Sequence, residues 1–323
     1  MRVVVIGGTG HIGSYLTPRL VAAGHDVVVL SRGERQPYRS HPAWSRVTRV
    51  QADRTAEEAA GTFGDRVAEL APDAVADLTC FTPDSAAALL DAVRGRIGHL
   101  LHCGTIWVHG AAVEVPMTED APRRPFGAYG EAKAATEELL LSESRRGGVP
   151  TTVLHPGHIV GPGWTPIGPA GNLDLDVIGR LARGEEVVLP NVGLETLHHV
   201  HADDVAQSFQ RALQHRSLAL GESFHVTSER AVTLRGLAEA VATWFGSVAK
   251  LSYAPLQEWE ADGSEHAEAT VQHVLHSSSV SIDKARRLLN YRPRYTSLEA
   301  VAESLDWLIE HGRLDLGGLR PVL

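Results

Sequence analysis

The stretch Val3-Val4-Val5-Ile6-Gly7-Gly8-Thr9-Gly10-His11-Ile12-Gly13 places a short apolar run directly before a turn with a glycine at every third position. A continuous apolar run of this length is typical of a buried parallel strand. Apolar residues then recur with helical spacing from Tyr15 to Ala23, Gly24 ends that helix, and a second apolar run covers residues 26–30. This order of strand, glycine turn, helix and strand predicts a βαβ unit that binds a dinucleotide.

The glycines of this turn have separate expected roles. Gly7 permits the tight turn, Gly10 lets backbone amides approach a pyrophosphate, and Gly13 lets the helix pack closely on the strand. The phosphates are expected at the N-terminus of the helix. The expected cofactor contacts in the turn are Gly7, Thr9, Gly10, His11, Ile12 and Gly13.

The end of the second strand bears on the choice between NAD and NADP. It reads Leu30-Ser31-Arg32-Gly33, without the carboxylate that binds the ribose of NAD, and Arg32 is suited to a 2′-phosphate. Six arginines lie between residues 31 and 54, against two acidic residues. We therefore expect NADP rather than NAD, with Ser31 and Arg32 in contact with it. The alternative is a solvated basic loop. Asp53 either binds the adenine amino group or ends a strand.

Strand and helix patterns alternate as far as Leu154, with further expected strands at residues 46–51, 74–79 and 99–103. This alternation predicts an α/β fold with a doubly wound parallel sheet (Rossmann) and a smaller C-terminal substrate lobe. We expect the dinucleotide-binding domain at 1–154 and the lobe at 155–323, with about 198–228 returning to the first domain. The other expected cofactor contacts are Leu78, Thr79, Lys133, His155 and Gly157.

Composition narrows the class of protein. With 323 residues and 43% hydrophobic content, the chain can bury a large core. The formal net charge of −9 argues against a nucleic-acid surface, although the local arginines leave RNA binding as an alternative. No apolar run approaches the roughly 18 residues of a membrane span, so we expect no membrane partner and a cytoplasmic location. Cys80 and Cys103 lie in apolar stretches and are expected to be buried thiols.

Tyr129-Gly-Glu-Ala-Lys133 places a phenol and an ammonium four residues apart, hence on one face of a helix. Such a pair can move protons at a carbonyl or a carbinol. Thr105 follows the fifth expected strand, and polar residues at that edge of a doubly wound sheet face the ligand. The expected catalytic residues are Tyr129, Lys133 and Thr105.

These motifs resemble the extended short-chain dehydrogenase/reductase family, the group of NAD-dependent epimerases and dehydratases. The resemblance covers nearly the whole chain. Its elements, in family order, are the glycine turn, Thr105 to Gly110, Tyr129 with Lys133, His155 to Gly163, Val200 to Ala206, and Ser281 to Leu289. Residues 224–233 and 236–238 further resemble the subgroup that contains chloroplast stem-loop-binding proteins and bacterial epimerase-like enzymes.

The resemblance implies roles for the catalytic residues. Tyr129 would be the general acid/base, Lys133 would lower the Tyr129 pKa and bind the nicotinamide ribose, and Thr105 would hydrogen-bond the substrate oxygen. A homodimer formed through the helices at 84–94 and 129–144 is also implied. Two positions depart from the family. Ile106 and Trp107 replace the acidic residues that drive dehydration, and Leu197 replaces an arginine that holds a nucleotide phosphate.

Histidine is enriched, with seventeen in the chain. Neutral imidazoles and indoles suit an uncharged, polyhydroxylated ligand. The expected substrate contacts are Thr105, Trp107, Tyr129, His158, Trp164 and His199. The alternative for the histidines is a structural role. His198-His199-Val200-His201 has no neighbouring cysteine or carboxylate pattern that completes a metal site, so no metal is expected.

The sequence thus predicts an NAD(P)-dependent epimerase or oxidoreductase that transfers hydride at a secondary carbinol of a sugar or sugar-like molecule. Epimerisation is preferred to the alternative of an NADPH-dependent ketone reductase. An alternative of another class is a catalytically vestigial RNA-binding or regulatory protein.

Overall fold

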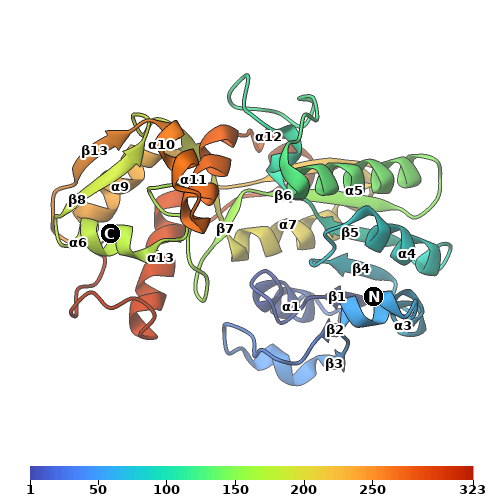
Figure 1. Cartoon of the computed structure of the whole chain (residues 1–323). Helices are drawn as coiled ribbons and strands as arrows, with labels where there is room; N and C mark the ends of the chain where they lie inside the picture. The colour runs from blue at the N-terminus through green and yellow to red at the C-terminus, as the bar shows by residue number, and fades with distance from the viewer. Residues whose placement is uncertain (323) are drawn as a thin grey trace.

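The computed structural model describes residues 1–322, and its centre is a seven-stranded parallel sheet (Figure 1). The strands of this sheet are β1 (Arg2–Ile6), β2 (Asp26–Ser31), β3 (Thr48–Gln51), β4 (Ala74–Asp77), β5 (His99–Cys103), β6 (Thr151–Pro156) and β11 (Ser223–Val226). Their order is β11-β6-β5-β4-β1-β2-β3, with every neighbouring pair parallel. The chain winds outward from β1 in both directions, which confirms the predicted doubly wound α/β fold.

Helices cover both faces of this sheet. On one face lie α1 (Gly13–Ala22) and α7 (Ala202–Gln214), and on the other lie α3 (Phe63–Glu69), α4 (Pro83–Val93) and α5 (Gly127–Arg145). Alternate residues of β1 serve the two cores: Val3 and Val5 pack with α1 and α7, whereas Val4 and Ile6 pack with α3, α4 and α5. Because both faces are buried, the strand is apolar at successive positions rather than at alternate ones.

Shorter elements complete the domain built around the sheet. They are η1 (Pro42–Arg46), α2 (Arg54–Ala59), η2 (Ile106–His109), α8 (Arg216–Ala219) and α12 (Asp283–Leu289). The 3₁₀ turn η1 makes β3 begin later than the sequence predicted. β4 also ends before Thr79, because Leu78 leaves the sheet after one last bond from its N–H to the Ile6 carbonyl (3.1 Å).

A smaller lobe with its own apolar core lies beside the sheet, at the left of Figure 1. It contains α6 (Leu175–Ala182), β8 (Glu186–Pro190), α9 (Leu234–Trp244), β13 (Lys250–Ala254), α10 (Leu256–Asp262), α11 (Glu265–His276) and α13 (Ser297–Glu310). Two small strand pairs link it to the sheet: β7 (His158–Val160) with β10 (His199–His201), and β9 (Thr196–Leu197) with β12 (Val232–Thr233). Across residues 1–322, no helix is both long and apolar enough to cross a membrane.

Candidate active site

The glycine turn joins β1 directly to α1. Gly7 has φ +84°, a conformation that side chains other than glycine rarely adopt, and its carbonyl accepts from the Gly10 N–H (3.0 Å). A Cβ on Gly13 would lie 2.4 Å from the backbone of Gly8, so only glycine lets the helix start this close to the turn. The N-terminus of α1 therefore lies at the carboxyl edge of the sheet.

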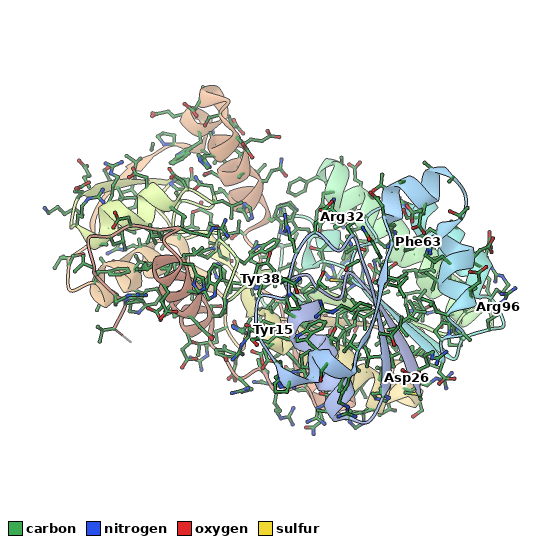
Figure 2. The ribbon with its side chains drawn as sticks, turned by 90° about the horizontal axis from the view of Figure 1, so that it is seen from below. Tyr15, Asp26, Arg32, Tyr38, Phe63 and Arg96 are labelled. Carbon is green, nitrogen blue, oxygen red and sulfur yellow. The ribbon has the colours of Figure 1, made fainter. Side chains whose placement is uncertain are left out.

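A cavity of about 740 Å³ runs along this edge from the β2–β3 connection to the lobe. Figure 2 shows Arg32 and Tyr38 on the side of the sheet domain that faces the lobe, whereas Asp26 and Arg96 lie farther from it. The sequence-predicted residues that line the cavity are Gly7, Thr9, Gly10, His11, Ile12, Gly13, Ser31, Arg32, Asp53, Leu78, Thr79, Thr105, Trp107, Tyr129, Lys133, Gly157, His158 and Trp164. The fold thus brings these eighteen residues to one cavity.

Tyr129 and Thr105 both line this cavity. Thr105 caps η2, and its hydroxyl accepts from the Trp107 N–H (3.3 Å). Tyr129 is 44% exposed and lines the cavity, and desolvation by the surrounding protein raises its pKa to about 12. The Thr105 side chain acts in the opposite direction and lowers the pKa. The phenol therefore holds its proton at neutral pH.

Lys133 lies one helical turn after Tyr129 and is only 2% exposed. Its ammonium donates to the carbonyls of Cys80 (2.6 Å) and Cys103 (2.8 Å). Burial lowers the Lys133 pKa, and the nearby Cys103 and Cys80 partly oppose that shift. Thr105 lowers the pKa of Tyr129 in this arrangement, and the predicted effect of Lys133 on that pKa stays a prediction.

The β2–β3 end of the cavity is rich in charge. Arg32 forms an ion pair with Glu34 (3.3 Å), and 58% of the Arg32 side chain is exposed. Arg54 is held by Asp77 (2.7 Å) and by Glu58 (2.7 Å). Asp53 caps α2 by accepting from the Ala56 N–H (3.1 Å), so its carboxylate has a structural use in addition to any contact with adenine.

The lobe end of the cavity is built from aromatic and imidazole rings. Trp107 stands edge-on to His273 (5.1 Å between ring centroids) and stacks on His276 (4.0 Å). Across the cavity, Trp164 stacks on His11 of the glycine turn (5.0 Å). This contact joins the turn of the sheet domain to the lobe through one pair of rings.

The hydrogen bonds of His158 fix which ring nitrogen carries its proton. Its Nδ1 accepts from the His198 N–H (3.2 Å), so the proton of the neutral ring is on Nε2. That Nε2 has no hydrogen-bond partner among the described residues. Burial lowers the His158 pKa well below its ordinary value, and neighbouring His273 and His199 lower it further. His158 is therefore a neutral ring with an unused donor.

Two predicted site residues do not line the cavity. His155 is fully buried, with Nδ1 bonded to the Thr105 N–H (3.1 Å) and Nε2 to Glu137 (3.1 Å). His199 is also fully buried, and its Nε2 donates to the Ile167 carbonyl (2.9 Å). Both rings support lining residues from behind, so the structure gives no direct ligand contact to either side chain.

Sequence reasoning also missed lining residues. Tyr38 comes from an irregular loop, Phe81 follows β4, and His273 comes from α11, far along the chain. The helical spacing of α11 places His273 and His276 near one face, but no motif indicated that this face meets Trp107.

Asp77, Cys80 and His102 lie with their potential metal-binding atoms within 4.8 Å of one another. Asp77 is already bound by the Arg54 guanidinium (2.7 and 3.0 Å), and the Lys133 ammonium bonds the Cys80 carbonyl. Two cations beside this cluster oppose a metal ion, so we assign none to it.

Comparison with known proteins agrees with this geometry. The model of the NAD dependent epimerase/dehydratase family matches residues 3–226, from β1 to the end of β11. The chain belongs to this family. It is an NAD(P)-dependent enzyme of the epimerase and oxidoreductase type, as its sequence motifs predicted.

Three relatives illustrate the range of the family. The 2′-dehydrokanamycin reductase of Streptomyces kanamyceticus is 29% identical, over 97% of this chain and 86% of its own. The chloroplast stem-loop binding protein of 41 kDa b of Arabidopsis thaliana is 24% identical, over 97% of this chain and 80% of its own. A UDP-glucose 4-epimerase of Thermotoga maritima, solved with UDP-glucose, shares the fold with a TM-score of 0.73 at 21% identity, over 96% and 99% of the two chains.

Proposed function

We propose that this enzyme interconverts a ketone and a secondary carbinol of an uncharged, sugar-like molecule. The observation that carries the substrate class is the neutral lobe end of the cavity. Lys133 is the only charged side chain among the described residues that line this end, and its ammonium is bonded to two carbonyls. Burial lowers the pKa of both His158 and His273, so both rings are neutral near pH 7.

A nucleotide diphosphate would require cations at this end, because burying unpaired phosphate charge is costly. Leu197, where nucleotide-sugar members of the resembled family carry an arginine, is fully buried in β9. The name of the Streptomyces relative is that of a reductase, which supports ketone reduction. Epimerisation, in which the ketone stays bound and is reduced on its other face, is the second candidate, supported by relatives named as UDP-glucose 4-epimerases.

The residues of the cavity fit a nicotinamide dinucleotide. The glycine turn at the N-terminus of α1 would hold the pyrophosphate, and Lys133 would hold the nicotinamide ribose. When bound, the nicotinamide supplies or accepts the hydride. We further propose a preference for NADP, because Arg32 and Arg35 line the β2–β3 end and the exposed ion pair of Arg32 with Glu34 is weak.

The chain's own residues then handle the substrate oxygen. In the direction of reduction, the Tyr129 phenol donates its proton to the carbonyl oxygen as the carbon is reduced, and Thr105 hydrogen-bonds the same oxygen. A phenol with a pKa of about 12 keeps its proton until an alkoxide develops, as a general acid for ketone reduction must. We propose that the Nε2–H of His158, a lining residue whose Nε2 has no partner among the described residues, binds a second oxygen of the substrate.

The test uses the purified protein with NADPH that carries deuterium at C4, a panel of cyclic ketones and keto-sugars, and UDP-glucose in parallel. We expect NADPH consumption and deuterium in the carbinol product for members of the uncharged panel, and no 4-epimerisation of UDP-glucose. Epimerisation of UDP-glucose with retained NAD would overturn the proposal. Mass spectrometry of the denatured protein shows which dinucleotide co-purifies.

Two further proposals concern assembly and location. We propose a homodimer formed through α4 and α5, supported by the family resemblance and by their side-by-side packing on one face of the sheet. Size-exclusion chromatography with light scattering tests it. We propose a cytoplasmic location, which fractionation of cells tests. RNA binding is the alternative of another class: the name of the Arabidopsis relative and the local arginines favour it, and the net charge of −9 opposes it.

A further inference from the structure

A chain of hydrogen bonds runs behind the cavity, from Thr105 to α5. The Thr105 N–H donates to Nδ1 of His155 (3.1 Å), and Nε2 of His155 lies 3.1 Å from Oε1 of Glu137. Arg123 holds the same carboxylate (2.6 Å). His155 is fully buried and Glu137 nearly so, which makes each of these bonds costly to break.

The hydrogen-bond network fixes the proton of His155. A backbone N–H can only donate, so the Nδ1 that faces Thr105 carries no proton. The proton is therefore on Nε2, which donates to Glu137. In a doubly protonated ring, the Nδ1–H of His155 would point at the N–H of Thr105, and neither group could accept a hydrogen bond. His155 is thus a neutral ring with an assigned tautomer.

The local sequence creates the space for this ring. A Cβ on Gly104 would lie 2.6 Å from Nδ1 of His155, so glycine is required beside it. The last bond between β5 and β6 is from the Gly104 N–H to the Leu154 carbonyl (2.7 Å). The next N–H along the chain, that of Thr105, donates to the His155 side chain instead of to a carbonyl of β6.

The network also returns to the helix of the catalytic pair. Tyr129, Lys133 and Glu137 are spaced by four residues and lie on one face of α5. Glu137 and His155 therefore connect this helix to the main chain of Thr105, and the Thr105 side chain lines the same cavity as Tyr129 and lowers the pKa of its phenol. One short path of hydrogen bonds, through His155 and Glu137, thus links the end of β5 to the helix that carries Tyr129.

We propose that His155 is a positioning residue that sets the place of Thr105 relative to Tyr129. It does so through Nδ1, without contact with substrate or cofactor. This inference rests on the proposed roles of Tyr129 and Thr105, so its test includes one measurement that needs no substrate.

The test compares two variants that preserve different atoms of the ring. In His155→Asn, an amide oxygen takes the place of Nδ1 and still accepts from Thr105. In His155→Gln, the amide lies near the place of Nε2, and the Thr105 N–H loses its acceptor. A misplacement of about 1 Å in an active site costs on the order of 100-fold in rate. We expect kcat to fall about 30-fold or more in His155→Gln and to stay within about 3-fold in His155→Asn, with the Kd for NADP⁺ unchanged in both.

Two further measurements isolate the path through Thr105. In a Thr105→Val background, His155→Gln should lower kcat by less than about 2-fold, because residues that act through one another are not additive. In the NADP⁺ complex of protein labelled with ¹³C at the tyrosine Cζ, the Tyr129 pKa should rise in His155→Gln and stay unchanged in His155→Asn. This titration is independent of the substrate, and Tyr129→Phe identifies the resonance.

Equal losses in the Asn and Gln variants, or additive losses with Thr105→Val, would overturn the proposal. So would an unchanged Tyr129 pKa in His155→Gln, even if no substrate has been found. If His155→Gln does not fold, Gly104→Ala replaces it, since its Cβ displaces the His155 ring and moves Nδ1 away from the Thr105 N–H. That variant should then show the same loss of kcat and the same rise in the Tyr129 pKa, and wild-type values in it would contradict the role of His155.

Discussion

The ammonium of Lys133 lies 6.0 Å from the centroid of the Tyr129 ring, and both of its hydrogen bonds in the structure go to main-chain carbonyls. Those carbonyls belong to Cys103 at the end of β5 and to Cys80 just after β4. Lys133 therefore ties α5 to two strand ends at the edge where the cavity lies. The two residues of the motif have separable tasks, and their substitution should have different consequences.

Replacing Tyr129 by Phe should remove the proton donor and leave the fold intact. General acid–base catalysis contributes about 10²–10⁴-fold, so we expect kcat to fall by about that factor while NADPH binding is unchanged. The measurement is the NADPH-dependent reduction of the best ketone of the panel. Tyr253→Phe, at an exposed position of β13, is the matched control and should keep wild-type activity.

Replacing Lys133 by Met should affect stability as well as activity. The change leaves two buried carbonyls without their donor, which we expect to lower the free energy of unfolding by about 2 kcal/mol. Urea denaturation followed by circular dichroism measures it. Lys250→Met, at an exposed position, should leave the unfolding midpoint unchanged. Equal midpoints for Lys133→Met and the wild type would contradict the anchoring role.

Replacing Arg32 by Ala should weaken binding of NADPH by about 10-fold and leave NADH binding unchanged, because the 2′-phosphate loses a charged hydrogen bond. Isothermal titration with each dinucleotide tests this. Arg96→Ala is a matched control, since Arg96 lies on the sheet domain away from the lobe (Figure 2). An equal loss for both dinucleotides in Arg32→Ala would place Arg32 elsewhere than at the 2′-position.

Replacing His158 by Phe keeps an aromatic ring and removes the unused Nε2–H, together with the Nδ1 that accepts from the His198 N–H. One hydrogen bond to a neutral oxygen contributes about 0.5–1.5 kcal/mol, so KM for the ketone should rise about 2- to 10-fold, with a smaller change in kcat. Steady-state kinetics measure both constants. His266→Phe alters an exposed histidine and should change neither. A wild-type KM in His158→Phe would remove this ring from substrate binding.

Protonation of the Glu137 carboxylate in acid should lower the free energy of unfolding. Burial alone would raise the Glu137 pKa, but the hydrogen bonds from His155 and Arg123 and the charge of Arg123 outweigh it and hold that pKa well below its ordinary range. The carboxylate therefore contributes stability above its unfolded pKa of about 4.3, and this contribution is lost as the pH falls below that value. Urea unfolding between pH 7 and pH 3 should show a shallower acid loss in Glu137→Gln than in the wild type. Glu138→Gln, at the exposed next position, should follow the wild type; parallel curves for all three would refute the assignment.

The fold was predictable because its signals are local. Four of the first five strands, β1, β2, β4 and β5, are short runs that both sheet faces bury, and Gly7 and Gly13 mark where the turn must be tight. Strand limits were less certain, since η1 shortens β3 at a stretch that also reads as extended. The limits given for the two domains stay a prediction.

The site was predictable where a motif and its place in the sheet coincide. Thr105, Tyr129 and Lys133 line one cavity because a strand end and the next helix are adjacent in this fold. His155 and His199 lie in stretches that approach the cavity, but strand residues alternate in direction and the sequence does not say which side chains face the ligand. His273 could not be predicted as a lining residue, since the packing of α11 against Trp107 is a tertiary contact without a signal in the local sequence.

The stacked rings of His11 and Trp164 make one residue of the phosphate-binding turn a direct neighbour of a partly exposed indole in the lobe. Any molecule that fills the turn alters the surroundings of that indole. Tryptophan fluorescence can therefore follow the arrival of the dinucleotide without a label. A signal that is lost in Trp164→Phe would belong to this stack, and it would give the protein an optical readout of occupancy before any substrate is known.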